Sequence, residues 1–139
     1  MRKSAALSRR RFLVGAVGGG MLLAAPFAGL VPPARAGSST VVVTMTDEMK
    51  FKPSPVVIHV GDTVRWESDS VLVHTVTADP SLAAKASDVA LPDGAATFNS
   101  GNISPGGHFE HTFKTAGRYR YFCIPHEAVG MVGEVVVKP

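Results

Sequence analysis

Near its C-terminal end the chain reads Gly117-Arg-Tyr-Arg-Tyr-Phe-Cys123-Ile-Pro-His126-Glu-Ala-Val-Gly-Met131, and an apolar run over 133–137 follows. The composition of residues 118–123 is typical of a β-strand, and the final Val-Val-Val predicts a second strand. Between the two strands, a cysteine, a histidine and a methionine lie within nine residues. This stretch therefore predicts a strand–loop–strand unit whose loop carries several metal-binding side chains.

The spacing of these three side chains constrains the shape of the loop. Neighbouring side chains of a strand point to opposite faces, so three such ligands cannot all lie on one flat strand and face one point. We expect Cys123 to end one strand, His126 to sit on the bend and Met131 to begin the return strand. Pro125 and Gly130 are of the residue types that shape such a bend. A loop of this form leaves His126 near the surface.

A second histidine extends the set of candidate ligands. His74 lies 49 residues before Cys123, where a short strand begins after a loop. One thiolate, two imidazoles and one thioether are the ligands of a blue-copper electron-transfer centre. The soft sulfur ligands favour Cu(I) and imidazole serves both Cu(I) and Cu(II), so the ion can change charge with little ligand movement. The residues alone leave His59, His108 and His111 as competitors of His74.

The rest of the chain predicts an all-β fold. β-Branched and apolar residues, punctuated by turn residues such as Gly61-Asp62, favour further short strands in five stretches, which are 40–46, 56–60, 63–67, 74–78 and 108–113. Residues 81–90 predict one short helix, with Ser81 as its N-cap. About seven to eight strands with one short helix indicate a β-sandwich.

Composition and charge exclude several classes of protein. The single cysteine excludes an internal disulfide and a zinc site built from several thiolates. The net charge of +3 suggests a nucleic-acid binder, but six of the fourteen basic residues lie in residues 1–36, which contain no acidic residue. Residues 37–139 carry eight basic and eleven acidic residues, a net charge of −3. We therefore expect no nucleic-acid partner.

The first 36 residues are typical of a bacterial export signal. Arginines at positions 9–11 precede an apolar stretch from Phe12 to about Val31, and Ala34-Arg-Ala36 ends it as a small-x-small cleavage site. The adjacent arginines resemble a twin-arginine signal. A retained membrane anchor is the alternative, but Gly18-Gly-Gly20 and the cleavage site favour removal after Ala36. We expect a periplasmic protein of residues 37–139, without stable membrane insertion.

The order of motifs in residues 40–138 resembles that of the cupredoxins, in the plastocyanin, pseudoazurin and halocyanin group. The matching motifs follow the same order along the chain, and they are Gly61-Asp-Thr-Val-Arg-Trp66, His74-Thr-Val76, Pro105-Gly-Gly-x-Phe109, Gly117-x-Tyr-x-Tyr-x-Cys-x-Pro-His126 and Gly130-Met-x-Gly133. The resemblance implies a Greek-key β-sandwich that holds one copper ion at one end. It implies that His74, Cys123, His126 and Met131 are the ligands, and it favours His74 over His59.

Three positions depart from the pattern of that family. Val73 stands where the family commonly has proline before the upstream histidine, and Ser68 stands where asparagine is frequent. Both belong to the loop that positions His74. Phe122 replaces the tyrosine that precedes the cysteine in plant-type plastocyanins, so the second electron entry of those proteins is not expected here.

The function that these features favour is a periplasmic one-electron shuttle that works as a monomer. Its partners would be larger redox proteins, such as a cytochrome or a copper- or quinone-linked enzyme, which dock near His126. An enzyme is disfavoured because the chain has no His-x-His pair for a further copper site. The alternatives are a copper carrier or storage module and a β-sandwich adhesion domain, which a blue colour and a reversible redox potential would distinguish from a shuttle.

Overall fold

A computed structural model describes residues 37–139 of the protein. The predicted export signal and its cleavage after Ala36 lie outside the described residues. Within residues 37–139 there are nine strands, namely β1 (Thr40–Thr46), β2 (Phe51–Lys52), β3 (Val56–His59), β4 (Thr63–Asp69), β5 (Thr77–Ala78), β6 (Phe98–Asn99), β7 (His108–Thr112), β8 (Gly117–Phe122) and β9 (Val132–Lys138). Three short 3-10 helices accompany them, namely η1 (Pro80–Leu82), η2 (Ala86–Asp88) and η3 (Ile124–Val129).

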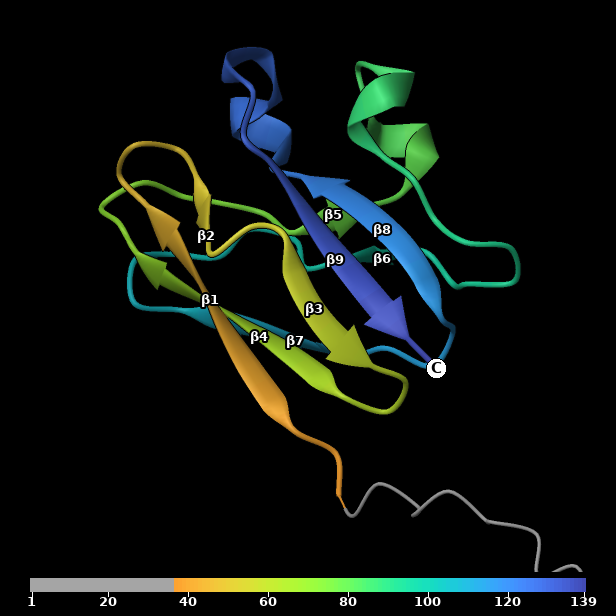
Figure 1. Ribbon diagram of the computed structural model, residues 1–139. Coiled ribbons are helices and arrows are strands. Elements are labelled where there is room, and N and C mark those ends of the chain that lie inside the picture. The colour runs from red at the N-terminus through yellow and green to blue at the C-terminus, as the bar shows by residue number, and fades with distance from the viewer. Residues whose placement is uncertain (1–36) are drawn as a thin grey trace, which may run out of the picture. The chain divides into compact units, whose positions relative to one another are not determined.

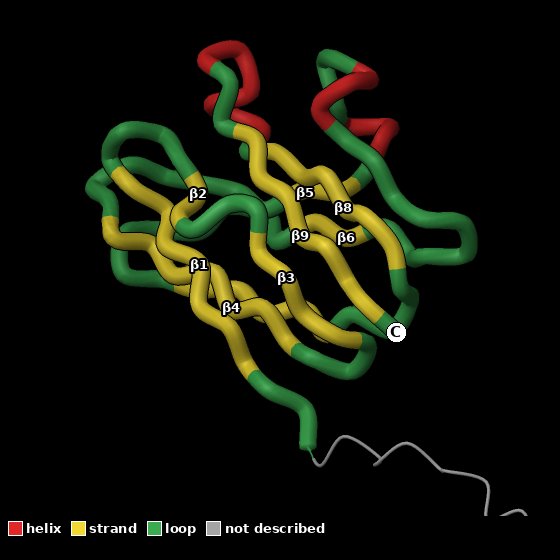
Figure 2. The backbone as a smooth tube through the Cα atoms, in the orientation of Figure 1, coloured by secondary structure: helices red, strands yellow, loops and turns green. Residues whose placement is uncertain are grey.

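The strands form two sheets that pack face to face (Figure 1). One sheet has the order β2-β1-β4-β7 and the other the order β3-β9-β8-β5-β6. The β1–β4 and β3–β9 pairs are parallel and the other pairs are antiparallel. The tube drawing shows strands and loops with only short helical turns (Figure 2). The predicted all-β sandwich is confirmed, and the strand count is higher than expected because three strands are only two residues long.

Aromatic side chains fill the space between the sheets. Trp66 is fully buried, and its ring centroid lies 5.3 Å from that of Tyr121 and 6.4 Å from that of Phe113. The alternation along β4 places Val64 and Trp66 inward. Tyr121 points into the same core two residues before Cys123. The core therefore extends directly to the end of the sandwich where β8 ends.

The predicted helix over residues 81–90 is wrong. The chain forms only the turns η1 and η2, and the N-cap of η1 is Asp79, whose carboxylate accepts a hydrogen bond from the Ser81 amide at 2.9 Å. Ala90 is extended because it exchanges two backbone hydrogen bonds with Arg120, at 2.9 and 3.1 Å. Tertiary hydrogen bonds thus override the local preference of an alanine-rich segment for a helix.

His111, one of the competitors of His74 in the sequence, has a structural role. It lies on the same face of β7 as Phe109, is half-buried, and stacks on Phe98 with the ring centroids 4.2 Å apart. His108 is exposed on the opposite face of the strand. Among the described residues, these two histidines do not belong to the candidate metal-binding group of His, Cys, Asp and Glu side chains.

Burial of His111 predicts a pH dependence of stability. Desolvation lowers the pKa of His111 below its ordinary value of 6.5, so the unfolded state binds more protons than the folded state near and below that pH. The free energy of unfolding should therefore fall as the pH decreases from 8 to 5. We expect His111→Gln to reduce this decrease in urea unfolding experiments, which measure the free energy of unfolding at each pH. Equal pH profiles for wild type and His111→Gln would contradict the assignment.

Candidate metal centre

His74 enters the site from a loop rather than from a regular strand. Only Thr77–Ala78 of the predicted strand 74–78 forms β5, and His74 itself makes an isolated antiparallel bridge with Ile103. In this bridge the His74 amide donates to the Ile103 carbonyl at 3.1 Å, and the Ile103 amide donates back at 2.8 Å. The His74 side chain is fully buried. The bridge holds this histidine at the end of the sandwich.

The loop between β8 and β9 has the form that the spacing of its residues predicts. Cys123 follows the last residue of β8, and His126 lies in η3 with Pro125 in its first turn. The helix ends at Gly130, whose φ of 83° and ψ of 28° place it in the left-handed region that suits glycine. Met131 then leads into β9, and its carbonyl accepts a hydrogen bond from the Cys123 amide at 3.0 Å. The loop thus closes on itself.

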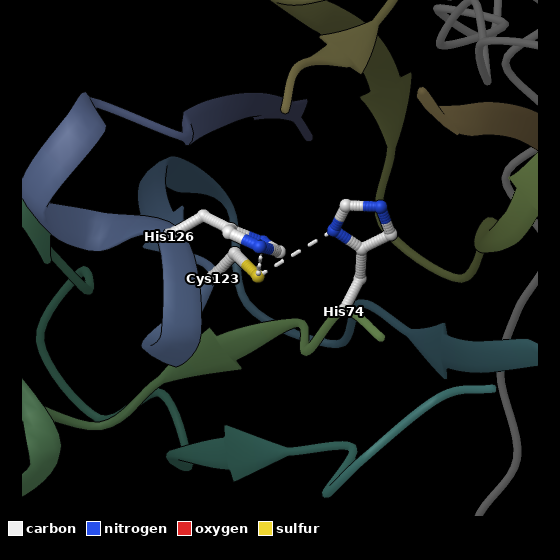
Figure 3. A group of neighbouring side chains, drawn as sticks. All are labelled: His74, Cys123 and His126. Atoms are coloured by element: carbon white, nitrogen blue, oxygen red, sulfur yellow. Dashed lines mark hydrogen bonds between the residues drawn. The ribbon is translucent and has the colours of Figure 1, made fainter. Parts of the chain in front are cut away.

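Three of the four predicted ligands converge on one point (Figure 3). The Cys123 sulfur lies 3.8 Å from Nδ1 of His74 and 3.4 Å from Nδ1 of His126, and the candidate ligand atoms of the three residues lie within 4.8 Å of one another. With metal–sulfur and metal–nitrogen bonds of about 2.3 and 2.0 Å, trigonal coordination separates sulfur from nitrogen by about 3.7 Å. The three donors therefore fit a metal ion bound between them.

Met131, the fourth predicted ligand, is fully buried at the same end of the protein. Its amide donates a hydrogen bond to the His126 carbonyl at 3.2 Å, and its carbonyl accepts from Cys123. The backbone of Met131 thus contacts the backbones of two of the converging residues. Its role as an axial ligand remains a prediction. His59, which competed with His74 in the sequence, ends β3 and is not part of the group.

Burial sets the protonation preferences of these donors. Desolvation raises the pKa of the Cys123 thiol, although the hydrogen bond from the Thr75 amide acts in the opposite direction. Desolvation and the nearby His126 both lower the pKa of His74. The neutral imidazole of His74 is therefore favoured, and its lone pair is available to a metal. Protons compete with a metal for the Cys123 thiolate, so metal affinity should decrease as the pH falls.

Thr75 connects the two halves of the site, and the sequence analysis assigned it no role. Its amide donates to the Cys123 sulfur at 3.2 Å, and its hydroxyl oxygen accepts a hydrogen bond from the Ile124 amide at 2.8 Å. Thr75, which directly follows His74, is thereby bonded both to Cys123 and to Ile124, the next residue of the ligand loop. Its position directly after His74 was the available signal. A hydroxyl there can accept a hydrogen bond from a neighbouring loop.

Residues 68–74 include two side-chain polar atoms that are buried without a hydrogen-bond partner in the described part of the chain. They are Nε2 of His74 and the hydroxyl of Ser68. The second nitrogen of a metal-binding histidine usually donates to a carbonyl, a carboxylate or water. Among residues 37–139, no carbonyl or carboxylate takes this role for Nε2 of His74. Of the positions that depart from the cupredoxin pattern, Val73 lies in the loop directly before His74, whereas Ser68 lies in β4 rather than in the loop where we expected it.

Residues 38–138 match the family model of copper-binding proteins of the plastocyanin/azurin family. The chain belongs to this family. It is 35% identical over 92 residues to a chloroplastic plastocyanin from Tetradesmus obliquus, a match covering 63% of this chain and 58% of that protein. It is 32% identical over 112 residues to plastocyanin from Prochlorothrix hollandica, with 78% of this chain and 81% of that protein covered.

Solved cupredoxin structures share the fold. An oxidised variant of amicyanin aligns with a TM-score of 0.55 and 28% identity, covering 70% of this chain and 81% of amicyanin. The protein is thus a plastocyanin-like cupredoxin, from a family of electron-transfer copper proteins, and copper is its cofactor. The group of one thiol and two imidazoles suits this ion, because these donors serve both Cu(I) and Cu(II).

Proposed function

We propose that this cupredoxin is a periplasmic one-electron shuttle, with copper bound by His74, Cys123, His126 and Met131. The convergence of the Cys123 sulfur with Nδ1 of both histidines carries the proposal. When bound, the ion supplies a reversible one-electron couple. The protein supplies a fixed arrangement of donors, because the Thr75 hydrogen bonds and the loop bonds of Met131 restrict their movement.

The difference in burial between the two histidines supports His126 as the point of electron entry and exit. His74 and Cys123 are fully buried, whereas His126 is partly exposed. Exposed apolar side chains lie on the same short helix, with Ile124 40% and Val129 65% exposed. A weak and transient redox encounter needs only a small surface of this kind. The partner is a larger redox protein, such as a cytochrome or a copper- or quinone-linked enzyme, which docks around His126.

The periplasmic location rests on the amino-acid sequence of residues 1–36. A basic start, an apolar middle and a small-x-small end support export, and the adjacent arginines support the twin-arginine route. Within residues 37–139 no helix has the length and apolar character required to cross a bilayer. Cell fractionation with a variant in which Arg9, Arg10 and Arg11 are replaced by lysine tests this route. Undiminished export of that variant would contradict it.

The test of the function is a titration of the purified protein with Cu(II), followed by visible spectroscopy and voltammetry. We expect one copper per chain, an intense blue absorbance from thiolate-to-copper charge transfer, and a reversible one-electron wave. A copper carrier or storage module would bind copper without fast and reversible electron exchange. A protein that binds copper without blue colour would contradict the proposed site.

Replacement of the axial ligand should change the redox potential and preserve copper binding. In Met131→Gln, an amide oxygen replaces a soft thioether that favours Cu(I), so we expect the reduction potential to fall. Voltammetry measures the potential, and metal analysis checks that one copper per chain remains. Loss of copper from this variant would show that Met131 holds the ion more strongly than a weak axial ligand does. An unchanged potential would show that it is not a ligand.

A further inference from the structure

A buried carboxylate follows the exposed histidine ligand. Glu127 is only 5% exposed, although glutamate is seldom buried without partners. Both of its carboxylate oxygens accept backbone hydrogen bonds, Oε2 from the Ala84 amide and Oε1 from the Lys85 amide, each at 3.0 Å. These donors lie 42 and 43 residues away in the sequence. The carboxylate therefore makes a tertiary connection.

This connection joins the ligand loop to the segment that carries η1 and η2. Ala84 and Lys85 lie between these two turns, and Glu127 lies in η3 beside His126. Figure 1 shows the green turns of residues 80–88 and the blue turns of η3 at the same end of the sandwich. Short 3-10 turns are weak by themselves, and the Glu127 carboxylate supplies two hydrogen bonds that join the two segments.

We propose that Glu127 is a positioning residue of the copper centre, which fixes the ligand loop and places a buried carboxylate on the residue that follows His126. This inference rests on the proposed function. The backbone of Glu127 contributes to the same loop, because its carbonyl accepts a hydrogen bond from the Gly130 amide at 2.8 Å. Anchoring the side chain of Glu127 thus restricts the whole turn that carries His126.

The charge has a defined effect on the redox equilibrium. The Glu127 carboxylate is buried, and water screens a buried charge much less than an exposed one. Cu(II) carries one more positive charge than Cu(I), so a nearby carboxylate stabilises the oxidised form. The ammonium group of Lys85 belongs to an exposed residue and is screened by solvent. Glu127 should therefore lower the reduction potential.

The matched pair of variants Glu127→Gln and Asp79→Ala tests this inference. The glutamine keeps the size of the side chain but loses the charge and one of the two acceptors, so we expect the Cu(II)/Cu(I) equilibrium to shift severalfold toward Cu(I). Asp79 also accepts two hydrogen bonds, both from Ser81 within the same segment. Its replacement should lower stability without changing the potential. A shift smaller than twofold in Glu127→Gln, or an equal shift in both variants, would overturn the proposal.

Hydrogen exchange of the copper-free wild type provides a second test that needs neither a variant nor copper. The Ala84 and Lys85 amides should be protected at least tenfold more than the Ser87 amide, which lies in the same segment. Fast exchange at Ala84 and Lys85 would overturn the anchoring role even if Glu127→Gln failed to fold. If the Ala84 and Lys85 amides were protected but the protein stayed colourless on titration with Cu(II), the proposed function would be refuted. The anchoring contact of Glu127 would still be established.

Discussion

Cys123→Ser is expected to abolish the blue colour of the copper-loaded protein. The intense absorbance requires charge transfer from a thiolate sulfur to Cu(II), and Cys123 is the only cysteine in the chain. A serine hydroxyl is nearly the same size, so the fully buried site should still fold around it. The visible spectrum after titration with Cu(II) should therefore lose essentially all of the blue band.

The same measurement on two histidine variants separates the candidate ligands. His74→Gln should also lose the blue band or replace it with a different spectrum, because Nδ1 of His74 lies 3.8 Å from the sulfur. His59→Gln is the control, since His59 lies at the end of β3, outside the ligand group. A blue Cys123→Ser protein, or a blue band that depended on His59 and not on His74, would refute the ligand assignment.

Gly133→Ala should destabilise the protein by about 1–3 kcal/mol, the usual cost of forcing extra atoms into a packed core. Gly133 is the direct cross-strand partner of Tyr121 in the β8–β9 pair. A Cβ atom at position 133 would lie 2.4 Å from both Cζ and the hydroxyl oxygen of Tyr121. The tyrosine ring is fully buried and packs against Trp66 at 5.3 Å, so it has little room to move.

Urea unfolding of the copper-free protein measures this cost, and a double-mutant cycle identifies its source. In a Tyr121→Leu background the ring is absent, so the further change Gly133→Ala should cost much less than it does in the wild type. Equal costs in the two backgrounds would show that the destabilisation does not come from the tyrosine. Because Tyr121 lies two residues before Cys123, the Gly133→Ala variant should also bind copper less tightly.

Local sequence was sufficient where few neighbouring residues control the structure. The composition of residues 63–67 predicted a strand, and β4 forms there with Val64 and Trp66 facing the core. Pro125 and Gly130 predicted the bend that carries His126, and Gly130 adopts a backbone conformation that favours glycine. These predictions held because strand periodicity and turn conformations depend on residues close together in the chain.

Prediction failed where distant parts of the chain supply the decisive hydrogen bonds. Residues 81–90 have the composition of a helix, but Glu127 takes the amides of Ala84 and Lys85, and Arg120 pairs with the backbone of Ala90. Intrinsic helix propensities are worth less than about 1 kcal/mol per ordinary residue. Tertiary hydrogen bonds in a packed domain can override them, and a pattern within ten residues contains no sign of these bonds.

The amino-acid sequence by itself determined that a thiol, an imidazole and a thioether share one short loop, because Cys123, His126 and Met131 lie within nine residues. Only the tertiary structure decided which other histidine meets them. The packing of the two sheets and the bridge to Ile103 bring His74 to the Cys123 sulfur across 49 residues of sequence. Side-chain convergence over such a separation depends on the register of whole sheets, which no local pattern specifies.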